Sequence, residues 1–129
     1  EDDSAACTVV QTFKTVGAEY VFCHREVDTL QLQGLRILQG LLDTYGALLT
    51  LDGEAFQAML DGRGRADLRM LLRRLPTHLL SAYRVALAQE QGADAPLWEF
   101  YQRTRLLLDF VSGLTDQLAQ DEYRLLMAQ

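Results

Sequence analysis

The chain has 129 residues, 49% of them hydrophobic, and its 12 basic and 18 acidic side chains give a net charge of −6. This length allows one domain with a buried core, whereas the negative charge argues against a general nucleic-acid coat, which needs positive charge to neutralise phosphates. No apolar run is long enough to cross a membrane, and two cysteines are too few for a disulfide framework. We therefore expect a cytoplasmic protein with reduced cysteines and no membrane segment.

Apolar residues recur at helical spacing and no run alternates with a period of two, so the pattern predicts an all-α fold. We expect a helical bundle of about five to six helices that forms a single domain over residues 1–129. The first helix is predicted over residues 4–22, with Ser4 as its N-cap. Its apolar face carries Val9, Phe13, Val16 and Tyr20.

A break near His24 leads to a second helix, predicted over residues 26–49. Gly34 and Gly40 lie inside it, where each glycine costs roughly 1 kcal/mol relative to Ala. They indicate the close approach of another backbone or a ligand, or else ordinary tight packing between helices. Cys23, in an apolar helical context, is expected to be a reduced core residue. The apolar face of the helix comprises Val27, Leu30, Gly34, Ile37, Leu41, Tyr45 and Leu48.

The second half of the chain is richer in turn signals. Asp52-Gly53 predicts a turn before a short helix over residues 53–60, and a further short helix is expected over residues 66–75. The Gly- and Arg-rich residues 61–65 between them form a predicted flexible loop, and an amphipathic helix follows over residues 77–91. A last helix is predicted from Pro96 to Met127, bent at Gly113. Its inward face is expected at Leu97, Tyr101, Leu108, Val111, Leu114, Leu118 and Leu125.

Three blocks of the chain resemble the C-terminal helices of the deoxyguanosine triphosphate triphosphohydrolase family, which consists of HD-domain hydrolases. They are YVFCHREVDTLQLQGLRILQGLLDTY from Tyr20, PLWEFY from Pro96 and DFVSGLTDQLAQDEYRLL from Asp109. The blocks stand in the order of the family and near its spacing, and the match is weakest between Asp52 and Pro76. The resemblance implies the C-terminal portion of a helical enzyme that hydrolyses dGTP to deoxyguanosine and triphosphate.

The resemblance also implies a cofactor and partners for the full-length enzyme. Family members hold a divalent metal, Mg, Mn or Co, with a His, a His-Asp pair and a further Asp. Neither His24 nor His78 is followed by Asp, so we expect the HD region to lie N-terminal to this chain. The chain alone is then expected to bind no metal, to contain no catalytic residue and to be inactive. Implied partners are dGTP or another dNTP, further copies in a homo-oligomer, and single-stranded DNA.

Two groups of residues are the candidates for substrate binding. Gln31 stands where the family pattern L-E-L-Q-G has Glu, on a helix that resembles a wall of the nucleotide pocket. Its amide both donates and accepts, so a strict preference for guanine is less expected; the alternative is a solvated surface Gln. Arg63, Arg65 and Arg69, with Arg73 and Arg74, form an arginine cluster that is suited to bind a triphosphate. The alternatives are a contact with a neighbouring subunit, single-stranded DNA binding, or a solvated face paired with local acids.

Other residues have expected supporting roles. His24 is predicted to cap a helix or donate a hydrogen bond at the helix break. Asp109, Thr115 and Asp116 belong to the DFVSGLTD block, where they either support the pocket, with Asp116 paired to Arg105, or join helices by hydrogen bonds. The alternative functions are a non-enzymatic protein-interaction module and a regulatory domain that binds nucleotides or single-stranded DNA. Trp98, Phe100 and Tyr101 are expected as core and interface anchors.

Overall fold

The computed structural model of the protein describes residues 5–89 and 92–127. It divides into two units, Glu1–Arg36 and Ile37–Gln129. Over the described residues the model contains seven α-helices and no strand, which confirms the predicted all-α fold. Seven helices are found instead of five to six because the last predicted helix is in fact two.

The first unit contains α1 (Ala5–Val16), a π-helical turn η1 (Gly17–Val21) and the start of α2 (Arg25–Gly46). None of its described residues is buried. The predicted apolar face of the first helix is therefore exposed: Phe13 is 74% exposed and Tyr20 is 73% exposed. Cys23 is also exposed, so its prediction as a core residue is wrong. The reason is that a single helical layer has no second layer to bury its apolar side.

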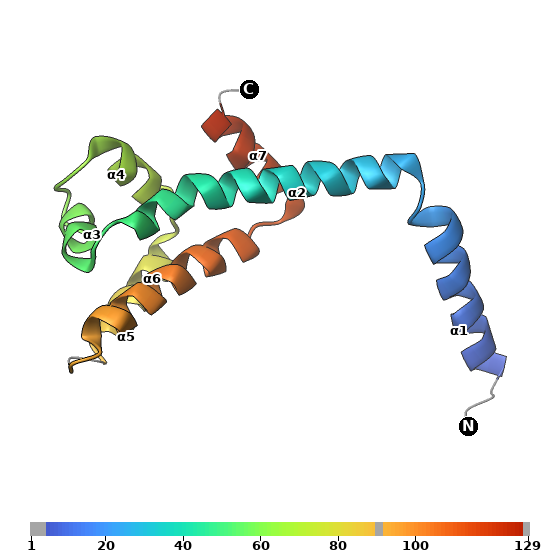
Figure 1. Cartoon of the computed structure of the whole chain (residues 1–129), viewed down its shortest axis with the longest axis horizontal. Coiled ribbons are helices and arrows are strands. Elements are labelled where there is room, and N and C mark those ends of the chain that lie inside the picture. Colours follow the sequence, from blue (N-terminus) through green and yellow to red (C-terminus); the bar gives the residue numbers. More distant parts are fainter. Residues whose placement is uncertain (1–4, 90–91, 128–129) are drawn as a thin grey trace. The chain divides into compact units, whose positions relative to one another are not determined.

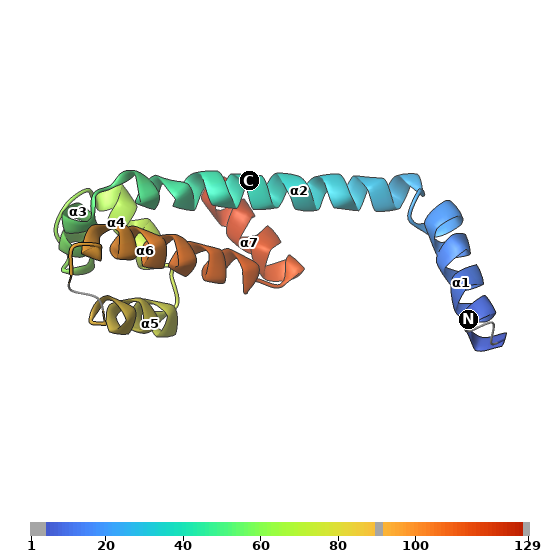
Figure 2. The ribbon, with the colours of Figure 1, turned by 60° about the horizontal axis from the view of Figure 1, so that its bottom comes forward.

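The second unit continues α2 and adds six elements. They are η2 (Ala47–Thr50), α3 (Gly53–Leu60), α4 (Ala66–Leu72), α5 (Thr77–Leu87), α6 (Ala95–Ser112) and α7 (Asp116–Met127). Helices α5 and α6 lie side by side (Figures 1 and 2), and α3 contacts both α4 and α6. The core includes Leu41, Tyr45, Leu48, Phe56, Leu72, Tyr83, Leu106 and Phe110.

Local signals account for several helix ends. Asp52 caps α3, because its Oδ1 accepts a hydrogen bond from the backbone N–H of Ala55 at 2.7 Å. Pro76 directly precedes α5, whose buried face includes Tyr83 with the partly buried Leu79 and Leu87, as predicted. The predicted N-cap Ser4 and the last two residues of the predicted 77–91 helix lie outside the described residues.

The prediction of one bent helix from Pro96 to Met127 is wrong. Helix α6 ends at Ser112, and the backbone N–H of Gly113 closes it by donating to the carbonyl of Asp109. Thr115 then starts α7, because its hydroxyl accepts from the N–H of Leu118 at 3.3 Å. A C-cap glycine followed within two residues by an N-cap threonine ends one helix and begins another.

The predicted inward face of α6 is also largely wrong. Leu97, Tyr101 and Leu108 are 69%, 53% and 54% exposed, and Leu118 and Leu125 of α7 are exposed as well. Helix α6 buries instead Gln102, Arg103, Leu106, Leu107, Phe110 and Val111, of which only Val111 was predicted. The predicted face and the buried face both carry apolar residues. The spacing of apolar residues alone does not determine which of two such faces is buried.

The predicted face of α2 is confirmed within the second unit, where Leu41, Tyr45 and Leu48 are almost fully buried. Gly40 lies on the same helix, and a Cβ at this position would overlap the ring of Tyr123 from α7. The close neighbour of Gly40 is therefore a side chain, and the glycine makes room for it. A Cβ on Gly34 would meet nothing within 4 Å.

Candidate functional site

The arginine-rich loop between α3 and α4 has a defined backbone. Gly62 and Gly64 adopt positive φ angles of 82° and 87°, a region in which glycine is strongly favoured. The guanidinium of Arg69, on α4, donates a hydrogen bond to the carbonyl of Gly62 and so fastens the loop. Arg69 thus reaches inward, and its Nε is buried without a hydrogen-bond partner among the described residues.

Arg63 and Arg65, by contrast, point into solvent and pair with nearby acids. Arg63 lies 3.2 Å from Asp61, and Arg65 makes a two-pronged contact with Asp67, at 2.6 and 3.2 Å. The Arg65 guanidinium holds the pKa of Asp67 below its usual range. Both arginine side chains are about 70% exposed, at 73% and 70%. Exposed pairs of this kind are weak, so a ligand anion can compete for either guanidinium.

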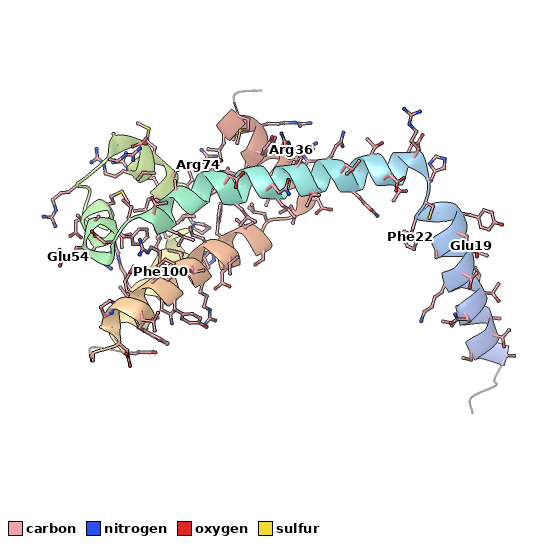
Figure 3. All side chains as sticks on the ribbon, in the orientation of Figure 1. Glu19, Phe22, Arg36, Glu54, Arg74 and Phe100 are labelled. Carbon is pink, nitrogen blue, oxygen red and sulfur yellow. The ribbon has the colours of Figure 1, made fainter. Side chains whose placement is uncertain are left out.

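Arg63 also lines a cavity of about 810 Å³ between α3 and the start of α6. Among the described residues that line this cavity, Arg63 is the one basic group and faces Asp52, Glu54, Asp61 and Glu99. Glu54, on α3, is labelled in Figure 3. Such an acidic wall repels a triphosphate. A phosphate chain bound by the arginines would therefore lie along the outer side of the loop.

Gln31 and His24 belong to the first unit, whereas the three arginines belong to the second. Gln31 is exposed on α2. His24 precedes α2, and its Nδ1 accepts a hydrogen bond from the backbone N–H of Glu26 at 3.4 Å. The histidine therefore satisfies one of the free N–H groups at the start of the helix.

The three residues of the DFVSGLTD block lie near the turn between α6 and α7. Asp109 pairs with Arg105 at 3.5 Å, so the predicted Asp116–Arg105 pair is wrong. These two residues of α6 are one helical turn apart, and this brings them together. Thr115 caps α7. Asp116 is the acidic residue in the first turn of this helix, where its negative charge interacts favourably with the positive end of the helix dipole.

Sequence reasoning missed a buried network around Arg103. This side chain is 2% exposed and donates to the carbonyls of Leu48 and Leu51, at 3.1 and 2.6 Å, and to Glu99 at 3.0 Å. Glu99 accepts in turn from the hydroxyl of Tyr83 at 2.6 Å, and burial raises the pKa of this tyrosine. The signal available in the sequence was the i, i+4 spacing of Glu99 and Arg103.

The aromatic surroundings of Arg103 complete its site. The guanidinium carbon lies 5.2 Å from the ring centre of Phe56 and 5.6 Å from that of Phe100; Figure 3 labels Phe100 on α6. Such contacts between a cation and ring faces are attractive. Arg103 thus joins α6 to the end of η2 and to α3.

A second missed network joins α2, α7 and the segment between α4 and α5. Arg74 (Figure 3) donates to both carboxylate oxygens of Glu122, at 2.6 and 2.5 Å. The hydroxyl of Tyr45 donates to the same carboxylate at 2.5 Å. The Arg74 guanidinium lowers the pKa of Glu122, and burial raises the pKa of Tyr45. Arg74 of the predicted cluster is therefore engaged in the fold.

A smaller cavity of about 250 Å³ lies between α5 and α6. Trp98 and Tyr83 line it together with Gln102, which is only 7% exposed. Trp98 donates its indole N–H to the carbonyl of Ala86 at 2.9 Å. Trp98 is thus held in place but lies outside the hydrophobic core, and Phe100 and Tyr101 are 45% and 53% exposed, so the core role expected of these three residues is wrong.

Over residues 5–89 and 92–127, no group of three or more His, Cys, Asp or Glu side chains is arranged to hold a metal ion. Nor does this part of the chain contain a helix long and apolar enough to cross a membrane.

The fold and the sites define an all-α segment that carries exposed arginines and has no metal-binding cluster in its described part. No family model matches the chain. It is 55% identical over 133 residues to a probable deoxyguanosinetriphosphate triphosphohydrolase of Pseudomonas aeruginosa. Enzymes with the name deoxyguanosinetriphosphate triphosphohydrolase from Cronobacter sakazakii and Yersinia pestis are 40% and 43% identical.

Each match covers 99% of this chain but 26% of the relative. The chain therefore spans about a quarter of the length of the curated relatives it matches. The resemblance predicted from the sequence motifs is confirmed: the chain is similar to a C-terminal portion of deoxyguanosine triphosphate triphosphohydrolases.

Proposed function

We propose that this chain is the C-terminal quarter of an enzyme that hydrolyses dGTP to deoxyguanosine and triphosphate. The observation that carries the proposal is the identity of 40–55% to enzymes of that name along almost the whole chain. The metal, Mg, Mn or Co, and the groups that hold it would then belong to an HD-type region N-terminal to this segment. The chain by itself would be inactive.

Within the enzyme, we assign two roles in substrate binding to this segment. Arg63 and Arg65 would bind the triphosphate, since both guanidinium groups are exposed and their acidic partners are easily displaced. Arg69 would hold their loop in place through Gly62. Gln31 would stand in a wall of the pocket for the base, with an exposed amide that both donates and accepts.

The arginine assignment is tested in the full-length enzyme by Arg63→Ala and Arg65→Ala. Each change should lower kcat/KM for dGTP by about tenfold or more, because a hydrogen bond to a charged group is lost. Arg84→Ala, an exposed arginine on α5, is the matched control and should leave kcat/KM unchanged. The same kcat/KM for dGTP in all three variants would show that Arg63 and Arg65 do not bind the triphosphate.

The assignment of Gln31 is tested by Gln31→Glu in the same enzyme. A carboxylate accepts from both N–H groups on the edge of guanine but repels the acceptors of other bases. The ratio of kcat/KM for dGTP to that for dATP should therefore rise by about tenfold. An unchanged ratio would mean that Gln31 does not face the base.

The remaining proposals concern partners and location. The exposed Leu30, Leu32 and Leu35 of α2 provide apolar surface for homo-oligomer contacts. The exposed Arg63 and Arg65 provide positive charge for single-stranded DNA, whose binding would weaken with salt and need no metal. The reduced thiol of Cys23, which donates a hydrogen bond to the carbonyl of Ala18, suits the reducing cytoplasm.

A further inference from the structure

Helix α6 is apolar on two faces. One face is buried and contributes Leu106, Leu107 and Phe110 to the core. The other carries Leu97, Tyr101 and Leu108, which we name the α6 outer stripe and which are 69%, 53% and 54% exposed. Spacings of four and seven residues place these three side chains on one side of the helix. A helix with two apolar faces, of which only one is buried, has a second face that is suited to contact another surface.

The outer stripe has the surroundings of a contact surface. Trp98, itself held by the carbonyl of Ala86, stacks on Tyr101 with 5.7 Å between ring centres and 29° between ring planes. The charged pair Arg105–Asp109 lies beside Leu108 along the helix. An apolar centre with an aromatic anchor and a charged rim is the usual composition of a protein interface.

We propose that the α6 outer stripe docks against the part of the same polypeptide that lies outside this segment. This rests on the proposed function, in which the chain is one segment of a longer hydrolase. The chain covers 26% of its relatives, so most of such a polypeptide is available to cover the stripe. A covalently attached partner also has a high effective concentration, and it therefore competes favourably with a second copy.

The test uses the full-length enzyme with p-benzoylphenylalanine in place of Leu108. Light should produce a cross-link within one chain, to a peptide outside this segment, and the product should keep the mass of a single chain. The same replacement at Val85, which is 63% exposed on α5, is the matched control and should lose this cross-link. Tyr101→p-benzoylphenylalanine exchanges one aromatic side chain for another and repeats the test with little disturbance of folding.

Two results would overturn the docking proposal. One is a product with the mass of two chains joined through the stripe, which would assign the stripe to a second copy. The other is cross-linking from positions 101 and 108 that is no stronger than from position 85. Triphosphate release by the unmodified enzyme is measured in parallel. An internal cross-link without dGTP hydrolysis would refute the proposed function alone, whereas hydrolysis with a cross-link between copies would refute the docking alone.

Discussion

Arg103 is a buried cation that joins η2, α3 and α6 of the second unit. It donates to Leu48 and Leu51 at the end of η2, pairs with Glu99 and lies against two aromatic rings. A buried cation of this kind is costly unless its hydrogen bonds are made. The partners of Arg103 come from three elements, so the sequence alone did not predict that this arginine is buried. In the sequence, nothing distinguishes Arg103 from the nearby Arg105, which is exposed.

The substitution Arg103→Met should therefore destabilise the 129-residue chain strongly. It removes the charge but leaves Glu99 buried, and breaking a buried pair in this way costs about 3–5 kcal/mol. Urea unfolding followed by circular dichroism measures the loss. Arg84→Met, on the exposed side of α5, should change the free energy of unfolding by less than about 0.5 kcal/mol. Similar losses for both variants would contradict the role of Arg103.

Glu122 makes a second prediction at this scale, and it concerns pH. Its pKa is lowered in the folded chain, mainly by the hydrogen bonds from Arg74, whereas an unfolded glutamate titrates near about 4.3. Its contribution to stability is therefore complete above that pH and is lost as the pH falls through the lower folded value. We expect Glu122→Gln to lower the free energy of unfolding at neutral pH. The difference in this free energy between the variant and the parent chain should become smaller as the pH falls.

This pH dependence is checked by thermal unfolding of both chains from neutral pH to about pH 2. Asp121→Asn is a suitable control, because Asp121 is adjacent but exposed. A difference between Glu122→Gln and the parent that stays constant across this range would contradict the ion pair with Arg74.

At the scale of elements, the sequence predicted most helices, but the buried face of only some of them. The helix over Gly53–Leu60, the Tyr83 face of α5 and the Leu41–Tyr45 face of α2 follow from apolar spacing. The spacing failed for α6, where a second apolar face competes with the buried one. The break at Gly113–Thr115 was underestimated because a single glycine is compatible with a bend as well as a helix end.

Two glycines of the same helix offer a matched test of this packing. Gly40→Ala would place a methyl group against the ring of Tyr123, and overpacking of this kind should destabilise the chain by about 1–3 kcal/mol. Gly34→Ala meets open space and should raise helix stability by roughly 1 kcal/mol. Helix content during urea unfolding measures both. The same sign of change in the two variants would contradict the close approach of Tyr123 to Gly40.

At the scale of the candidate site, the sequence indicated the arginine cluster but not which of its side chains are exposed. The loop glycines 62 and 64 and the exposure of Arg63 and Arg65 agree with a charged loop. Arg69 and Arg74, however, are used to hold the fold. Which arginine meets solvent depends on contacts with Gly62 and Glu122, and these are set by tertiary packing that a run of arginines does not reveal.

At the scale of the whole molecule, the exposed apolar side chains and the relatives point the same way. Side chains such as Phe13, Leu97 and Leu125 are more than two-thirds exposed, at 74%, 69% and 69%. On α6, Leu97 forms one apolar stripe with Tyr101 and Leu108, and an exposed apolar stripe of this kind is typical of a contact region. An account in which this chain is one segment of a larger hydrolase explains both this surface and the quarter-length match.

The most direct test of this account is the release of inorganic triphosphate from dGTP, with Mg²⁺ or Mn²⁺, by the full-length protein and by the 129-residue chain. The other three dNTPs serve as comparisons. The account predicts that the full-length protein releases triphosphate and deoxyguanosine, while the 129-residue chain releases neither. No triphosphate from the full-length protein with any dNTP would contradict the account, as would release by the 129-residue chain alone.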